Sequence, residues 1–298
     1  MKRLLKYLLI ILLALIFIAI VSLLIFTDPD IPVDEIKEKY ALNASKYISI
    51  EGIDVHYSME GQGPDTLVMI HGTGSSLHTW QGWVDIMKDS IVTIRMDLPA
   101  FGITGPFKNR DYTTGHYLDF LNQFFEKLDL SRFSIAGNSF GGYLAWNYAV
   151  TFPGKVKKLI LLDASGYPSD HSVGVFTLAK NPITASILKR ITPRSFMLKN
   201  LKEVYVRDSL IGDELVDRYW HMARREGNRQ AFIDRVNRPS SDRSNLIKKI
   251  QRPTLIMWGD GDTWTDVDHA YLYERDIEGS KLIMYPNIGH TVMEEDPK

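Results

Sequence analysis

The chain has 298 residues, carries a net charge of −1 and contains no cysteine. This length is enough for one large core, or for one core with an inserted subdomain. The absence of cysteine excludes disulfides, a cysteine nucleophile and thiolate metal sites. A net charge this close to zero gives no overall field that would attract nucleic acid, so we expect no nucleic-acid partner.

The first residues are unlike the rest of the chain. Lys2, Arg3 and Lys6 precede a charge-free apolar run, Tyr7 to Phe26, and no small-residue cleavage site follows it. At about 1.5 Å per residue, a helix of this length spans roughly the 30 Å core of a bilayer. The pattern predicts a transmembrane signal anchor over residues 1–27. The basic flank predicts a single-pass membrane protein with a cytoplasmic N-terminus, the lipid bilayer as a partner, and the following domain on the extracytoplasmic side.

Residues 28–46 predict a polar linker with one short helix. The next segment, "YISIEGIDVHYSMEG", predicts two strands joined by a hairpin turn at Glu51-Gly52. Beyond it, short apolar runs alternate with amphipathic segments, which is typical of a mostly parallel sheet with helices on both faces. Further strands are predicted at 66–71, 91–97, 133–137, 156–163, 254–258 and 281–286. We therefore expect an α/β core formed by residues 47–163 and 251–298.

The alternation is interrupted by a helical segment without a convincing strand, which predicts a cap or lid over residues 164–250. This segment has 16 Lys and Arg against 9 Asp and Glu, a difference of +7. We interpret this surplus mainly as solvated helix faces. The alternative is a lid that favours anionic membrane lipid or an anionic substrate.

The stretch "AGNSFGG" follows the strand at 133–137 and precedes the helical segment "YLAWNYAV". A strand, then Gly-x-Ser-x-Gly, then a helix is the pattern of a nucleophile elbow. Gly137 and Gly141 lack bulk at the two places where the strand and the helix must approach each other. The start of the helix adds N–H groups and a positive dipole end where a negative oxygen would form. We predict that Ser139 is a nucleophile.

A serine needs a base to remove its proton and an acid to orient that base, in the chain order Ser, Asp or Glu, His. His290 follows the last predicted strand in a loop beside Gly289, whereas His269 lies within a predicted helix, so we favour His290 as the base.

Three carboxylates compete for the role of the acid. Asp262 fits a Gly-x-x-Asp spacing from Gly259 and ranks first, Asp163 at the end of its strand ranks second, and Asp260 ranks third.

An oxyanion hole needs two backbone donors directed at the developing negative charge. We predict the N–H groups of Phe140, the residue after the nucleophile, and of Thr73, in the turn "HGTGSS" after the strand at 66–71. Asp97, at the end of another strand, is interpreted as a carboxylate that either supports the catalytic residues from behind or anchors a loop. We interpret Trp80 and Trp83 as core residues rather than as the lining of a substrate pocket.

Five motifs, "HGTGSS", "DLPAFGITGP", "AGNSFGGYLAW", "WGDGD" and "GHTVMEEDP", occur in an order that resembles the α/β-hydrolase superfamily. The resemblance covers the chain from Tyr47 onward, and the "GNSxGG" form is similar to serine esterases and to the meta-cleavage carbon–carbon hydrolases. It implies a mostly parallel eight-stranded sheet, a helical cap inserted after the sixth strand, and neither cofactor nor metal. It names Ser139 as nucleophile, Asp262 as orienting acid and His290 as base.

The chain departs from the family pattern at three places. Ala100 replaces the usual glycine of "DLPGFG", and Thr291 stands where carbon–carbon hydrolases often have tryptophan. Such proteins also usually continue, beyond the position of Lys298, into a closing C-terminal helix. The sequence predicts a serine hydrolase that cleaves an ester or related acyl bond of a small-molecule substrate. A carbon–carbon bond hydrolase and a catalytically silent binding protein of the same fold remain alternatives.

Overall fold

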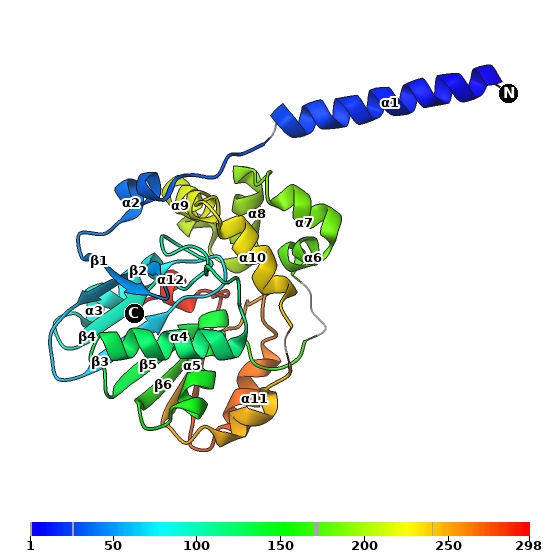
Figure 1. The fold of residues 1–298 in the computed structure, drawn as a ribbon. Coiled ribbons are helices and arrows are strands. Elements are labelled where there is room, and N and C mark those ends of the chain that lie inside the picture. The colour runs from blue at the N-terminus through cyan, green and yellow to red at the C-terminus, as the bar shows by residue number, and fades with distance from the viewer. Residues whose placement is uncertain (1, 26, 170–172, 240) are drawn as a thin grey trace.

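A computed structural model describes residues 2–25, 27–169, 173–239 and 241–298. Eight strands form one sheet in the order β1-β2-β4-β3-β5-β6-β7-β8 (Figure 1). β2 pairs antiparallel with both β1 and β4, and all other neighbours are parallel. The strands are β1 (Ser45–Ile50), β2 (Ile53–Glu60), β3 (Thr66–Ile70), β4 (Val92–Met96), β5 (Phe133–Asn138), β6 (Val156–Leu162), β7 (Thr254–Gly259) and β8 (Lys281–Tyr285). The predicted α/β fold with a mostly parallel sheet is confirmed.

Both faces of the sheet are covered by helices, because successive side chains of a strand point to opposite sides. In β3, Val68 and Ile70 join the larger core cluster, which also contains residues of α4 (Thr114–Lys127), α5 (Phe140–Thr151) and α11 (Asp268–Asp276). Leu67 and Met69 join the opposite cluster, together with residues of α3 (Gln81–Met87) and α12 (Val292–Glu295). This second cluster also contains Trp80 and Trp83, so their assignment to the core is confirmed.

The hairpin between β1 and β2 forms at the predicted turn. Glu51 and Gly52 both have positive φ, 52° and 74°, as a two-residue turn of the type that matches the twist of the flanking strands requires. This hairpin places β1 at one edge of the sheet, antiparallel to the strand that continues toward the core.

Between β6 and β7 the described residues form helices and no strand. Figure 1 shows these helices together on one side of the sheet, and we call them the cap. They are α6 (Gly174–Lys180), α7 (Pro182–Leu188), α8 (Arg194–Val204), α9 (Asp213–Ala223) and α10 (Asn228–Asn237). Asn181 separates α6 from α7 because its side chain accepts hydrogen bonds from the N–H groups of Ile183 and Thr184, which starts a new helix at Pro182.

Residues 28–44, which belong to the segment 28–46 predicted as a polar linker with a short helix, pack against the cap. The helix is α2 (Val33–Tyr40), and it buries Ile36 against Ile103 and Met222. Asp30 forms an ion pair with Arg229 of α10 at 2.7 Å. We call residues 28–44 the strap, because they run over the cap before the chain enters β1.

Truncating the buried residue of the strap tests this packing. We expect Ile36→Ala to lower the free energy of unfolding by about 2–5 kcal/mol, because it removes buried methyl groups and leaves a cavity. Urea denaturation measures the difference, with exposed Glu35→Ala as the matched control. Equal stability of the two variants would show that the strap is not packed in solution.

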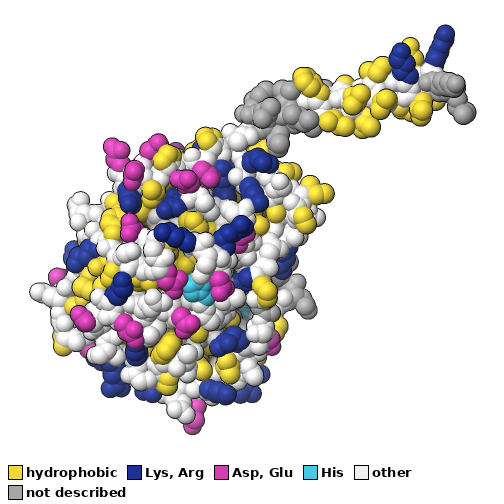
Figure 2. All heavy atoms as spheres, in the orientation of Figure 1, with side chains coloured by type: hydrophobic (Ala, Val, Ile, Leu, Met, Phe, Trp, Pro, Cys, Tyr) yellow, Lys and Arg dark blue, Asp and Glu magenta, His cyan; other side chains and the backbone are white. Residues whose placement is uncertain are grey.

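The N-terminal helix is α1 (Lys2–Ile25), and Figure 1 shows it extending away from the other elements. Figure 2 shows its described apolar side chains exposed on the surface. Within the described part of the chain, no helix combines the length and apolarity needed to cross a bilayer. The predicted transmembrane anchor is therefore not supported.

Candidate active site

Ser139 lies at a strained turn between β5 and α5. Its backbone has φ 53° and ψ −118°, a conformation that costs free energy for a residue with a side chain. The turn is closed by small neighbours: a Cβ on Gly137 would lie 2.3 Å from the carbonyl oxygen of Gly141, and one on Gly141 would lie 2.2 Å from that of Ile70. The glycines of the predicted elbow are thus required by close backbone contact.

His290 and Asp262 form a buried pair. The His290 Nδ1 lies 2.8 Å from the Asp262 Oδ2. The other carboxylate oxygen accepts the N–H groups of Trp264 at 2.7 Å and Thr265 at 3.1 Å, so the carboxylate is held from both sides. Because Asp262 engages Nδ1, the ring nitrogen left to act on a serine is Nε2. Ser139 and His290 line the same two cavities.

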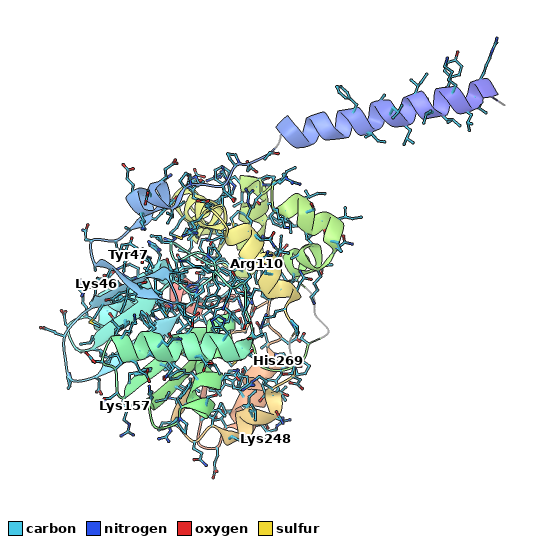
Figure 3. The ribbon with its side chains drawn as sticks, viewed as in Figure 1. Lys46, Tyr47, Arg110, Lys157, Lys248 and His269 are labelled. Carbon is cyan, nitrogen blue, oxygen red and sulfur yellow. The ribbon has the colours of Figure 1, made fainter. Side chains whose placement is uncertain are left out.

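The alternative candidates have other partners. Asp260 is exposed and accepts the N–H of Asn287. Asp163 is fully buried, with Oδ1 accepting the N–H of Gly259. His269, which Figure 3 labels, belongs to α11. Its Nε2 lies 3.8 Å from the carboxylate of Asp266 rather than from Asp262. Of the predicted acids and bases, the structure pairs Asp262 with His290.

The Asp163 carboxyl is fully buried, and the backbone N–H groups of Gly259 and Val292 lie beside it. Burial, and then the negative charge of Asp262, raise the pKa of Asp163 well above its ordinary value. A carboxyl whose pKa is raised by folding binds its proton more tightly when folded, so stability falls as the pH rises from the unfolded pKa toward the folded pKa.

Replacing the Asp163 carboxyl with the neutral amide of asparagine should remove this loss of folding stability at higher pH. We expect Asp163→Asn to become increasingly stable relative to the parent protein as the pH rises from 5 to 8. Urea unfolding at several pH values measures the difference, and Asp260→Asn on the exposed loop should show no such trend. A constant stability difference across this range would show that Asp163 is ionised throughout.

The two predicted oxyanion donors flank the serine. Phe140 is the first residue of α5, so its N–H has no partner within the helix. Thr73 lines both cavities with Ser139. Its neighbour Gly72 is so close that an added Cβ would lie 3.0 Å from the Cβ of Ser139. The turn after β3 therefore approaches the elbow closely, as an oxyanion hole requires.

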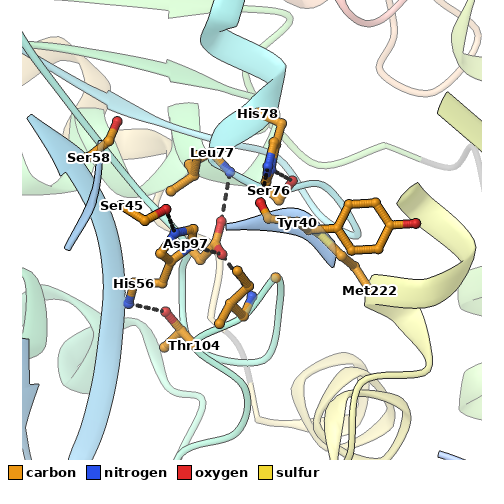
Figure 4. A network of polar contacts seen from close by, with 12 residues as sticks. Tyr40, Ser45, His56, Ser58, Ser76, Leu77, His78, Asp97, Thr104 and Met222 are labelled. Carbon is orange, nitrogen blue, oxygen red and sulfur yellow. Dashed lines mark hydrogen bonds and ion pairs between the residues drawn. The ribbon is translucent and has the colours of Figure 1, made fainter. Parts of the chain in front are cut away.

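Asp97 anchors the loops around this turn (Figure 4). Its Oδ1 accepts the N–H of Leu77 at 2.7 Å, and its Oδ2 accepts the N–H of Ile103 and contacts His56 Nδ1, both at 2.8 Å. The His56 ring continues to Ser45 Oγ at 2.6 Å. Burial alone would raise the pKa of Asp97, but the charge and hydrogen bond of His56 hold that pKa well below its ordinary value. The prediction of a loop-anchoring carboxylate is confirmed.

Removing this carboxylate should unfold the loops that it joins. We expect Asp97→Ala to lower the free energy of unfolding by about 3–5 kcal/mol, because it leaves His56 and two N–H groups buried without their partner. Asp85→Ala, at an exposed position, should change stability by no more than about 0.5 kcal/mol. Chemical denaturation of both variants checks the difference, and a small loss at position 97 would argue against the anchoring role.

His71 of the turn also has a structural role that we did not predict. Its Nδ1 lies 2.7 Å from the carbonyl oxygen of Gly72, and its Nε2 accepts the N–H of Leu98 at 3.0 Å. Burial lowers the pKa of His71, which favours the neutral ring that one donor and one acceptor contact require.

Glu295 was also missed, because "EED" is typical of a solvated acidic run. It is buried, and its two carboxylate oxygens accept the N–H groups of Gly289, Val206 and Arg207. In addition, the N–H of His290 donates to the carbonyl oxygen of Val204 at 2.8 Å. The loop that carries the base is therefore held against the end of α8 in the cap.

Two cavities meet at the serine. We call one the apolar cavity, with a volume of about 140 Å³, and the other the arginine cavity, with a volume of about 380 Å³. Both are lined by Thr73, Ser139, Trp264 and His290. The apolar cavity is lined by Val175, Leu188, Phe196, Met197, Leu201 and Phe232 of the cap. The arginine cavity is lined by Tyr143, Tyr167, Arg235, Arg238, Asp242 and Arg243. Each is far larger than the roughly 10–15 Å³ that a water molecule needs, so both can hold organic groups.

Comparisons with known proteins identify relatives that share this fold. A family model described as alpha/beta hydrolase fold matches residues 65–297. The chain is 26% identical to an uncharacterized hydrolase, YugF, of Bacillus subtilis, over 87% of this chain and 95% of the relative. It is 26% identical to a 2-hydroxy-6-oxo-2,4-heptadienoate hydrolase of Pseudomonas putida, over 82% of this chain and 88% of the relative. The crystal structure of a bacterial membrane phospholipase A is similar, with a TM-score of 0.73 and 25% identity, over 100% of this chain and 95% of that one.

Proposed function

The chain belongs to the α/β-hydrolase family and is a hydrolase, and from this premise we propose that it cleaves carboxylic esters through Ser139, His290 and Asp262. The observation that carries the proposal is the 2.8 Å contact between His290 Nδ1 and Asp262 Oδ2, beside cavities that His290 shares with Ser139. An oriented imidazole next to a serine on a strained elbow is the arrangement that activates a hydroxyl nucleophile.

The reaction proceeds in two halves. His290 Nε2 accepts the proton of the Ser139 hydroxyl as Oγ attacks the ester carbonyl carbon. The N–H groups of Phe140 and Thr73 donate to the negative oxygen of the tetrahedral intermediate. Its collapse breaks the bond to the alcohol, which leaves with the proton from His290, and an acyl-enzyme remains. Water, deprotonated by His290, then attacks the acyl carbonyl carbon. The second intermediate collapses as the protonated His290 returns this proton to Ser139 Oγ, which releases the acid and restores the serine hydroxyl.

The lining of the apolar cavity indicates that the substrate carries an apolar group on one side of the ester bond. Its cap residues contribute aliphatic, aromatic and thioether side chains, and burial of such a group is favourable by about 0.8 kcal/mol per CH₂. The similar solved structure is that of a membrane phospholipase A, and a phospholipase A is an ester hydrolase. This likeness supports the choice of an ester over other acyl bonds.

A carbon–carbon bond hydrolase is the second candidate, and one observation favours it. The relative from Pseudomonas putida bears the name of a dienoate hydrolase and matches most of this chain. Thr291, where such enzymes often have tryptophan, argues for the ester reading. Assays of dienone substrates beside 4-nitrophenyl esters separate the two activities.

The nucleophile is tested by removing its oxygen. We expect Ser139→Ala to lower kcat/KM on 4-nitrophenyl esters by about 10³-fold or more, since the remaining groups cannot form the acyl-enzyme. It should also abolish covalent labelling by a fluorophosphonate. Ser134→Ala on the same strand is the control and should retain both. Undiminished hydrolysis by a folded Ser139→Ala protein would refute the mechanism.

A further inference from the structure

The arginine cavity contains a positive charge that has no carboxylate partner in the part of the chain that the structure describes. Arg235, on α10, is 5% exposed. Its Nη2 donates to Thr73 Oγ1 at 2.9 Å, and its Nε has no hydrogen-bond partner among the described residues. The guanidinium carbon lies 4.5 Å from the centre of the Phe140 ring. The charge is thus held against both predicted oxyanion residues.

Two further arginines of this cavity also lack a carboxylate partner among the described residues. Arg238 donates to the carbonyl oxygen of Arg235 at 2.7 Å, and Arg243 donates to Asn147 Oδ1 at 2.6 Å. Of the described acidic residues, Asp242 alone belongs to the lining, and it is exposed and accepts the N–H of Ser244 at 2.8 Å. Among the described residues, the lining therefore has three cations and one anion, and the cations contact neutral oxygens and aromatic rings.

Other arginines of the cap show that carboxylate partners are available to it. Arg194 pairs with Asp213 and Asp217, each at 2.6 Å, and Arg229, which borders the apolar cavity, pairs with Asp30. Burial lowers the pKa of Arg235 to about 10, so it remains a cation at neutral pH. A buried cation without a counter-ion is costly, and an anionic ligand group would remove that cost.

We propose that the arginine cavity is a subsite for an anionic group of the substrate, a carboxylate or a phosphate, and that the apolar cavity takes the substrate's hydrocarbon part. This inference rests on the proposed function and narrows its substrate class. Because the two cavities meet at Ser139, the anion and the hydrocarbon lie on opposite sides of the scissile ester. Arg235 is positioned to donate to the anion from beside the oxyanion hole.

Matched ester pairs test the subsite on the full chain. On the alcohol side, the octanoyl ester of 4-hydroxybenzoate is compared with that of 4-hydroxybenzamide, and the octanoyl ester of 4-hydroxyphenyl phosphate distinguishes phosphate from carboxylate. On the acyl side, the 4-nitrophenyl monoester of octanedioic acid is compared with its methyl-capped form. We expect kcat/KM to be about 10-fold or more higher for the anionic member of at least one pair, as for a hydrogen bond to a charged group.

Arg235→Gln and Arg238→Gln should reduce this preference to about 1, whereas Arg190→Gln, an exposed arginine of the cap outside both cavities, should keep it. The readout is the ratio of kcat/KM values, because Arg235 also contacts Thr73 and its loss can slow both members of a pair. Arg238→Gln keeps the test valid if Arg235→Gln does not fold.

Binding provides a readout that does not depend on turnover. We expect titration calorimetry to show that benzoate or phenyl phosphate binds the parent protein more tightly than benzamide, and that Arg235→Gln loses this difference. If the protein hydrolyses no ester but still binds the anions more tightly than benzamide, the proposed function is rejected and the subsite stands. Ester hydrolysis with no preference for any anion, in turnover or in binding, would overturn the subsite alone.

Discussion

The backbone of Ser139 is held in an unfavourable conformation because three segments approach it closely. The end of β5, the start of α5 and the turn after β3 meet at Gly137, Gly141 and Gly72. At the first two positions a side chain would lie 2.3 Å and 2.2 Å from carbonyl oxygens. This contact presents the serine at the carboxyl edge of the sheet and brings the Thr73 turn beside it. The packing of the surrounding core stabilises the strained turn.

Two buried carboxylates keep the loops at this edge in place. Asp97 joins the segment after β4 to Leu77, and through His56 to Ser45 at the start of β1. Glu295 joins the loop of His290 to the residues that follow α8. Each carboxylate accepts N–H groups that no helix or strand would satisfy. The base, the oxyanion turn and the cap are thus connected through hydrogen bonds to backbone groups.

Residues whose roles follow from local spacing could be predicted from the sequence. Ser139 was recognisable by its flanking glycines, and the alternation of apolar runs predicted the parallel strands. The ranking of Asp262 above Asp163 rested only on a Gly-x-x-Asp spacing, because both residues follow neighbouring strands. Their partners in space, Gly259 for one and His290 for the other, separate them.

Contacts between residues far apart in the chain could not be predicted from local sequence patterns. Arg235 and Thr73 are 162 residues apart and touch because the cap folds back over the sheet. Composition indicated a basic cap, but not which cations would lack carboxylates. The strap was predicted as a linker, since a polar segment with one buried residue, Ile36, gives a weak hydrophobic signal.

The double attachment of Asp262 determines where the imidazole carries its hydrogen. With one oxygen accepting the Trp264 and Thr265 amides, an asparagine at this position would keep its own oxygen there. Its NH₂ group would then face His290 and donate to Nδ1. The ring would have to shift to the tautomer with hydrogen on Nε2, and it could no longer accept the serine proton. A change of a single atom, with the shape of the site preserved, would thus invert the polarity of the hydrogen bond on which the base depends.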